Sequence, residues 1–224
     1  MKRERTLSLD STVLSLTIDR QVRTTDDFMI RFFSTLCKSL LNILDDDKSI
    51  FQNATNSYSY KNEPCKRCGA KGRLISYGDY IRNFVYLINK QSIDSRIRPQ
   101  RFLCKSCNAT HALLPDIIIP YSPYSLRFML EVLIAYYERA NTVVEICEGF
   151  HIAVSTLYEW KKRIESHKEL LLGILVSQKT PALAFLRGLI KSSRLSDTLH
   201  TFFNKYGFSF MQNQSPLTSQ CHPP

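Results

Sequence analysis

The sequence predicts an α+β fold in which a small region of antiparallel strands precedes a bundle of helices. Two observations carry this prediction. Segments rich in Tyr, Ile, Val and Phe lie between two Cys-x2-Cys pairs, and apolar residues then recur at helical spacing from Ser125 to about His167. The chain has 224 residues, 44% of them apolar, which is enough for one substantial core or two small ones.

Residues 1–60 are expected to form an N-terminal arm and one helix, followed by a polar linker. Apolar residues alternate weakly up to residue 30, and a helical period then runs from about Asp26 to Leu44. We expect Asp45, Asp46 and Asp47 to end that helix and to face water. Residues 49–63 are polar and rich in Asn, Ser and Tyr, and we interpret them as the linker.

No secretion signal or membrane span is predicted. Asp10 and Asp19 interrupt the stretch after the basic start of the chain, and every apolar run is shorter than the roughly 18–20 residues of a spanning helix. We therefore expect a cytoplasmic, nucleoid-associated protein. In that reducing compartment, paired cysteines serve as metal ligands more often than they form disulfides.

Residues 61–111 contain four cysteines with the spacing of a metal site: Cys65, Cys68, Cys104 and Cys107. Two residues between paired cysteines let both sulfurs of a tight turn face one ion, and two such turns (knuckles) supply four soft ligands. Gly69 and Asn108 follow the pairs and suit the left-handed turn that a knuckle needs. The pattern predicts a four-cysteine zinc ribbon with one structural Zn²⁺, because four thiolates leave no open position for chemistry.

Three other interpretations of these cysteines remain open. The pairs could be unrelated, with one of them redox-active, although no βαβ pattern surrounds either pair. They could also hold an iron–sulfur cluster. Finally, His111 lies close enough to Cys107 in the sequence to replace one cysteine ligand.

The segment between the pairs is expected to form the strands of the ribbon. Residues 73–77 and 80–88 are rich in β-forming residues, with Gly78-Asp79 as the turn between them, and 97–103 lead into the second pair. Most of the net charge of +10 lies in 61–111, which hold 11 Lys/Arg and 3 Asp/Glu. Interleaved with aromatic residues, such a face can bind phosphates and stack bases; otherwise it is a solvated basic face. The basic residues are Arg82, Arg96, Arg98, Arg101 and Lys105.

Residues 112–124 contain Pro115, Pro120 and Pro123 and are expected to form an extended connector. Residues 125–168 predict three helices: one from Ser125 to Arg139, a second capped by Asn141, and a third after a break at 151–153. Two helices joined by a tight turn, with a third helix against them, form a helix-turn-helix; a plain helical bundle is the alternative. Further short helices are expected over 169–210, and 211–224 are expected to be a disordered tail.

Residues 150–160 resemble the turn and recognition helix of transposases and resolvases, except that His151 stands where Gly is usual and Ala153 where a Ser cap is usual. The turn must therefore hold a left-handed residue with a side chain. The resemblance implies which residues face double-stranded DNA: Val154, Ser155, Tyr158, Glu159 and Lys162 toward the bases, and Lys161 and Arg163 toward the phosphates.

Residues 64–165 are similar to a family of short, transposase-like bacterial proteins, in which a zinc ribbon precedes a helix-turn-helix as in the N-terminal part of insertion-sequence transposases. The run Thr110-His111-Ala112-Leu113-Leu114-Pro115-Asp116 carries this similarity, together with the four cysteines and Tyr80, Arg82, Arg101, Ile119, Pro120 and Tyr121. The resemblance implies DNA binding linked to mobile elements, with a transposase catalytic subunit or self-association as further partners.

No catalytic site is predicted in this chain. Transposases hold two metal ions with three carboxylates, but only Glu169 and Asp197 follow the third helix. We therefore expect a sequence-reading DNA-binding module or regulator that is not an enzyme. A subunit of a split transposase or nuclease, and an adaptor that binds another protein, are the alternatives.

Overall fold

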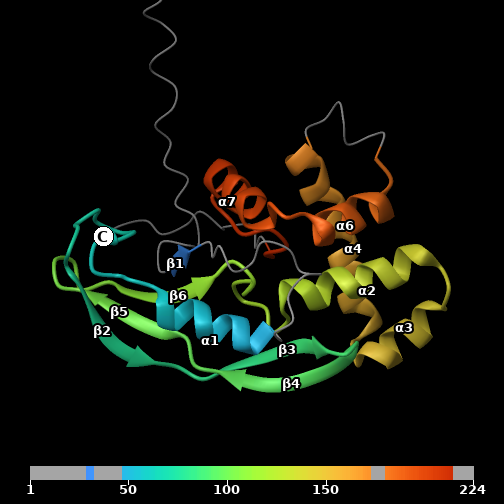
Figure 1. Ribbon diagram of the computed structural model, residues 1–224, viewed down its shortest axis with the longest axis horizontal. Coiled ribbons are helices and arrows are strands. Elements are labelled where there is room, and N and C mark those ends of the chain that lie inside the picture. Colours follow the sequence, from blue (N-terminus) through green and yellow to red (C-terminus); the bar gives the residue numbers. More distant parts are fainter. Residues whose placement is uncertain (1–28, 33–46, 173–179, 214–224) are drawn as a thin grey trace, which may run out of the picture.

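The computed structural model describes residues 29–32, 47–172 and 180–213 (Figure 1). Four strands form one sheet in the order β1 (Met29–Phe32), β6 (Thr110–Pro115), β5 (Gln100–Cys104) and β2 (Leu74–Asp79). β1 runs parallel to β6, and the other pairs are antiparallel. β3 (Arg82–Ile88) and β4 (Gln91–Ile97) form a separate antiparallel hairpin. The α+β class is therefore confirmed at this level.

The hairpin turn lies at a different place from the one that the sequence predicted. β3 and β4 are joined by Asn89 and Lys90, which have φ of 50° and 65°, as a two-residue hairpin turn requires. Gly78 instead lies inside β2, with φ of 100°, where the pairing with β5 shifts between Ser76 and Asp79. The Gly78-Asp79 signal thus marks a bulge rather than a turn between paired strands.

The three central helices lie close to their expected positions. α2 (Leu126–Glu138) is capped by Ser125, and α4 (Val154–Leu172) follows α3 (Val143–Phe150) after a short turn. Thr142, rather than the expected Asn141, caps α3 in a capping box with Glu145. His151 ends α3 in the left-handed conformation, with φ of 55° and ψ of 48°, which confirms the expectation of a left-handed residue with a side chain.

Two expectations for the N-terminal part were wrong. Residues 29–32, expected in a helix, form strand β1, while 33–44 lie outside the described residues. Most of helix α1 (Asp47–Ser57) lies in the segment that was expected to be a polar linker, and this helix covers one side of the sheet (Figure 1). Ile50, Phe51 and Ala54 form its buried face. Asp47 does not end a helix in water but begins α1, is buried, and accepts a hydrogen bond from Ser125 Oγ.

The expected connector is part of the core. Residues 112–115 belong to β6, and Ile117, Ile118 and Ile119 are at most 1% exposed. They pack with Phe84 of β3 and with α2, α3 and α4 in one continuous hydrophobic core. Burial of three consecutive isoleucines explains why this proline-rich segment does not act as a spacer between two separate cores.

The C-terminal helices confirm the expectation for 182–206: α6 (Ala182–Lys191) and α7 (Leu195–Tyr206) complete the described structure. The predicted tail began too early, because Met211 and Gln212 are buried. His167 of α4 accepts a hydrogen bond from Met211 N through Nδ1 (2.9 Å), and Phe202, Phe208 and Phe210 surround its ring. Residues 214–224 lie outside the described residues.

Candidate functional site

The four cysteines of the two pairs form one cluster whose sulfur atoms all lie within 4.8 Å of one another. Sγ of Cys65 lies 3.6 Å from Sγ of Cys107, and Sγ of Cys68 lies 3.7 Å from Sγ of Cys104. Four thiolates about 2.3 Å from a tetrahedral ion would lie about 3.8 Å apart, so these spacings fit a four-coordinate metal site. The cluster could therefore hold a metal ion, as the spacing predicted.

The backbone of the two pairs follows the same pattern. Gly69 N donates to Cys65 O (2.8 Å), and Asn108 N donates to Cys104 O (2.9 Å). Gly69 and Asn108 have φ of 71° and 56°. The left-handed residue expected after each pair is thus confirmed, and each turn presents both of its sulfur atoms on one side.

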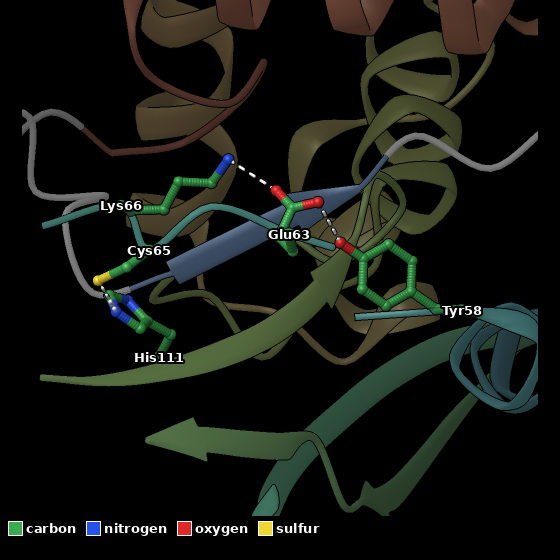
Figure 2. A network of polar contacts seen from close by, with 5 residues as sticks. All are labelled: Tyr58, Glu63, Cys65, Lys66 and His111. Atoms are coloured by element: carbon green, nitrogen blue, oxygen red, sulfur yellow. Dashed lines mark hydrogen bonds and ion pairs between the residues drawn. The ribbon is translucent and has the colours of Figure 1, made fainter. Parts of the chain in front are cut away.

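His111 lies beside the cluster but is not part of it. Its Nε2 is 3.2 Å from Sγ of Cys65, and the ring is buried (Figure 2). The four cysteines already complete a coordination shell, so His111 need not replace a ligand as the sequence had left open. A ring nitrogen at this distance can instead donate a hydrogen bond to the thiolate and orient it.

The segment before the first pair is held by a second polar contact (Figure 2). The carboxylate of Glu63 accepts hydrogen bonds from the Tyr58 hydroxyl (2.8 Å) and from Lys66 Nζ (2.9 Å). Burial, together with the Glu63 carboxylate, raises the pKa of Tyr58. These bonds fasten the end of α1 to the first knuckle.

The environment of the thiols differs from one cysteine of the cluster to another. Burial raises the pKa of the Cys65 thiol to about 12. Burial also opposes ionisation of Cys104, but hydrogen bonds from the backbone N–H groups of Ser106 and Cys107 and from the thiols of Cys65 and Cys68 together lower the pKa of Cys104 to about 6. Cysteines bind a metal ion as thiolates, so a cation bound at this cluster would release protons from it.

Residues at the start of α4 that were predicted to face bases are exposed. Ser155, Glu159 and Lys162 are exposed, and Val154 and Tyr158 are 42% and 47% exposed. Leu157, Trp160 and Ile164 occupy the opposite, buried side of the helix. The structure therefore brings the five residues onto one accessible side of α4.

The two predicted phosphate contacts on α4 lie differently. Lys161 is partly buried and pairs with Glu165 (3.6 Å). Arg163 donates to the carbonyl of Met211 (3.0 Å), and burial lowers its pKa. Glu159 raises the pKa of Arg163, against the effect of burial. Because Arg163 holds the C-terminal segment against α4, its assignment as a phosphate contact is corrected.

Two of the predicted basic residues line a cavity between α1 and β4. Arg96 and Arg98 are exposed there, and Lys48 of α1 joins them around a volume of about 440 Å³. Arg98 pairs with Asp79 (3.1 Å), and Lys48 donates to Ser95 Oγ (2.9 Å). Lys48 was missed because it follows Asp47 directly, where the sequence predicted the water-exposed end of a helix. Its spacing from Ile50 and Phe51 was the available signal.

The remaining basic residues of the ribbon lie elsewhere. Lys105 is exposed within the second Cys-x2-Cys turn. Arg82 is partly buried and donates to the carbonyls of Ile119 and Ser122 from one Nη2, so it holds the connector rather than facing solvent phosphates as expected. Arg101 is exposed and stacks on the ring of Tyr80.

A family model described as a domain of unknown function (DUF6431) matches residues 65–160. The match begins at the first cysteine of the cluster and ends at Trp160, so the similarity covers the cluster, the hairpin, α2, α3 and the first turns of α4. No curated protein and no solved structure matches the chain. Among the described residues, no helix has the length and apolar character needed to cross a membrane.

Proposed function

We propose that this chain is a zinc-carrying protein that reads short sites in double-stranded DNA. The observation that carries the proposal is the exposed side of α4. Val154, Tyr158 and Lys162 lie on it at helical spacing, while the opposite side is locked by Trp160 into the core. A helix held in this way, entered through a tight turn from α3, has the layout of a recognition helix.

Zinc is the metal that suits the cluster best. Four thiolates in two short turns form a closed, soft, tetrahedral site, and Zn²⁺ has no geometric preference that opposes such a site. The ion would have a structural role, since no coordination position is left for water or substrate. It would fix the two knuckles and, through Cys104, the end of β5.

Binding to the phosphate backbone of DNA is supported by the distribution of charge along the chain. Residues 61–111 carry 11 Lys/Arg and 3 Asp/Glu, and Arg96 and Arg98 are exposed beside Lys48. Contacts of this kind position a protein on duplex DNA but carry no sequence information. We therefore assign phosphate binding to this surface and base reading to α4.

The similarity of residues 64–165 to transposase-like proteins supports a link to mobile elements. In this proposal the chain is a DNA-binding module or regulator, without a catalytic domain of its own, that acts alone, as a self-associated form, or beside a transposase catalytic subunit. Incubation with supercoiled DNA and Mg²⁺ or Mn²⁺ tests this part. Cleavage that disappears when one acid is changed in a folded protein would identify a split nuclease instead.

Selection of binding sites from a pool of random duplexes is the direct test of DNA reading. We expect a short common sequence to emerge, and affinity for it to fall steeply with salt, with a slope of about −0.9 for each phosphate contact. The matched variant is Arg98→Ala, which should weaken all duplexes similarly and flatten that slope. Absence of salt-dependent duplex binding would contradict the proposal and favour a protein-binding adaptor.

A further inference from the structure

We infer that a second pocket, between the four-stranded sheet and the connector, receives an unpaired nucleobase of the bound DNA. The inference rests on the proposed function and adds a ligand class to it. The pocket has a volume of about 400 Å³, which is within the usual range of small-molecule sites of roughly 300–1,000 Å³. It is lined by Tyr80, Arg82, Arg101, Thr110, Ala112, Leu114 and Tyr121.

The floor of the pocket is one face of the sheet. Arg101 of β5 pairs with Ala112 of β6, and the pair Leu103 and Thr110 follows on the same face, because side chains alternate along a strand. Phe102, on the opposite face, belongs to the small core around the cysteines. The pocket and the metal centre thus use opposite faces of the same two strands.

One wall is a stacked pair of side chains. The guanidinium of Arg101 lies over the Tyr80 ring, 4.8 Å from its centre, and Arg101 is exposed. A guanidinium over an aromatic ring is planar and cationic, so a base can stack on it and a nearby phosphate can be bound by it. The described residues that line the pocket include two arginines and no carboxylate, a composition that favours an anion.

The other wall is Tyr121, which the connector presents in an unusual conformation. Its φ is 59°, a left-handed value that is rare for a bulky residue, and the side chain is 69% exposed. The guanidinium of Arg82 holds the carbonyls of Ile119 and Ser122 on either side of it. A strained residue that is kept in place by its neighbours and carries an exposed ring is typical of a ligand contact.

These features together favour a nucleobase over the aromatic side chain of a protein partner. Two tyrosine rings with a stacked arginine can enclose a flat ring, and the cation matches the phosphate that follows each base. A paired base inside a duplex cannot enter, because its faces are covered by its neighbours. The ligand is therefore a base at a bulge, a distorted site or a single-stranded end.

The test compares two duplexes that are identical except for one extrahelical 2-aminopurine, whose fluorescence falls when it stacks. Both are titrated with the full-length, metal-loaded protein at low salt. Base–aromatic stacking strengthens binding by about 5- to 150-fold per base, so we expect the bulged duplex to bind more tightly by a factor in this range, with quenching.

Tyr121→Asn is the main variant, because Asn tolerates the left-handed conformation but carries no ring. It should remove the preference and the quenching, while Tyr121→Phe should keep both. Tyr77→Asn is the matched control, since Tyr77 is 57% exposed on β2 but does not line the pocket. Tyr80→Leu provides a second variant on the opposite wall and should act like Tyr121→Asn.

The outcomes separate the two proposals. Equal affinity of both duplexes, or a preference that survives Tyr121→Asn, would overturn this inference and leave the proposed function standing. Absence of binding to either duplex would overturn the proposed function as well. An acidic peptide with one phenylalanine serves as competitor. If the two duplexes bind equally and the peptide binds in a manner that Tyr121→Asn abolishes, the pocket takes a protein partner and the inference is wrong.

Discussion

At the scale of single residues, Gly69 and Asn108 show how the knuckles are specified. Both residues close a turn whose amide donates back to the first cysteine of the pair, and both have positive φ. Glycine adopts this conformation without strain, and asparagine tolerates it better than most other residues. The conformation therefore follows from the residue types, and the effect of changing them can be stated.

Gly69→Ala should lower the free energy of unfolding by about 1–2 kcal/mol, because a Cβ is disfavoured at φ of 71°. Gly149→Ala is the matched control: a Cβ at either glycine would meet nothing within 4 Å, but Gly149 lies in helix α3. There alanine should be neutral or stabilising by up to about 1 kcal/mol. Urea unfolding of both variants measures the difference, and equal effects would contradict this account of the knuckle.

The cysteines differ in their predicted role. Cys65→Ser or Cys104→Ser should remove most of the bound metal, whereas Cys147→Ala should leave the metal content unchanged, because Cys147 is buried in the helical core. Elemental analysis of protein purified without added metal should find about one zinc per chain in the unchanged protein. Iron in place of zinc, or a folded protein without metal, would refute the zinc proposal.

At the scale of elements, α4 joins two functions: its first turns present exposed side chains and its last turns anchor the C-terminal segment. Tyr158→Ala or Lys162→Ala should reduce discrimination between preferred and unrelated duplexes by about 1–3 kcal/mol for each base that the variant no longer reads. Lys191→Ala, which removes the same charge from the exposed end of α6, is the control. Unchanged sequence preference in both α4 variants would show that this helix does not read bases.

The buried His167 near the other end of α4, which accepts a hydrogen bond from Met211 N, predicts that the stability of the fold depends on pH. Burial, with a contribution from Arg163, lowers the pKa of His167 to about 4 from its usual 6.5. The unfolded chain therefore binds a proton below pH 6.5 that the folded chain does not bind until about pH 4. Stability from this group is constant above pH 6.5, and about 3 kcal/mol is lost as the pH falls to 4.

His167→Gln isolates this effect, because Gln cannot gain the charge but still offers an acceptor to Met211 N. Urea unfolding between pH 7 and pH 4 should show a shallower loss of stability in the variant than in the unchanged protein. Acid also releases metal, but it does so in both proteins, so the difference between them reports on His167. Parallel pH curves would contradict the assignment.

At the scale of the whole molecule, two hydrophobic clusters of unequal size stabilise the fold. The larger one joins the hairpin, the connector and the helices, while the smaller one surrounds Cys65 and Cys104. None of the four clustered cysteines belongs to the larger one. The helices are thus expected to hold together when the knuckles lose their ion.

Removal of metal by a chelator should therefore lower the melting temperature but leave most of the far-UV helical signal in place. Hydrogen exchange should accelerate first in residues 65–74 and 104–110, which carry the knuckles. Readdition of zinc should restore the protection. A chelated chain that loses its helical signal together with the knuckles would show that the metal supports the entire fold.

The sequence alone determined those features of this protein that depend on near neighbours in the chain. The Cys-x2-Cys turns and the left-handed residue at His151 depend on local geometry, and the structure has them where the sequence predicted. The exposed residues of α4 were those that the resemblance to transposases and resolvases implied, and the structure has them on one accessible side of the helix. Its interpretation as a DNA-reading surface stays a prediction.

Only the tertiary structure decided which segments pair and what covers them. β1 was hidden because its parallel partner β6 is far away in the sequence. Helix α1 looked like a linker because few apolar residues mark its buried side, and the buried Asp47 accepts a hydrogen bond from Ser125, which caps a helix far away in the sequence. Arg82 and Arg163 were interpreted as free cations until the fold supplied backbone carbonyls. Such contacts depend on loop closure and burial, which no short stretch of sequence encodes.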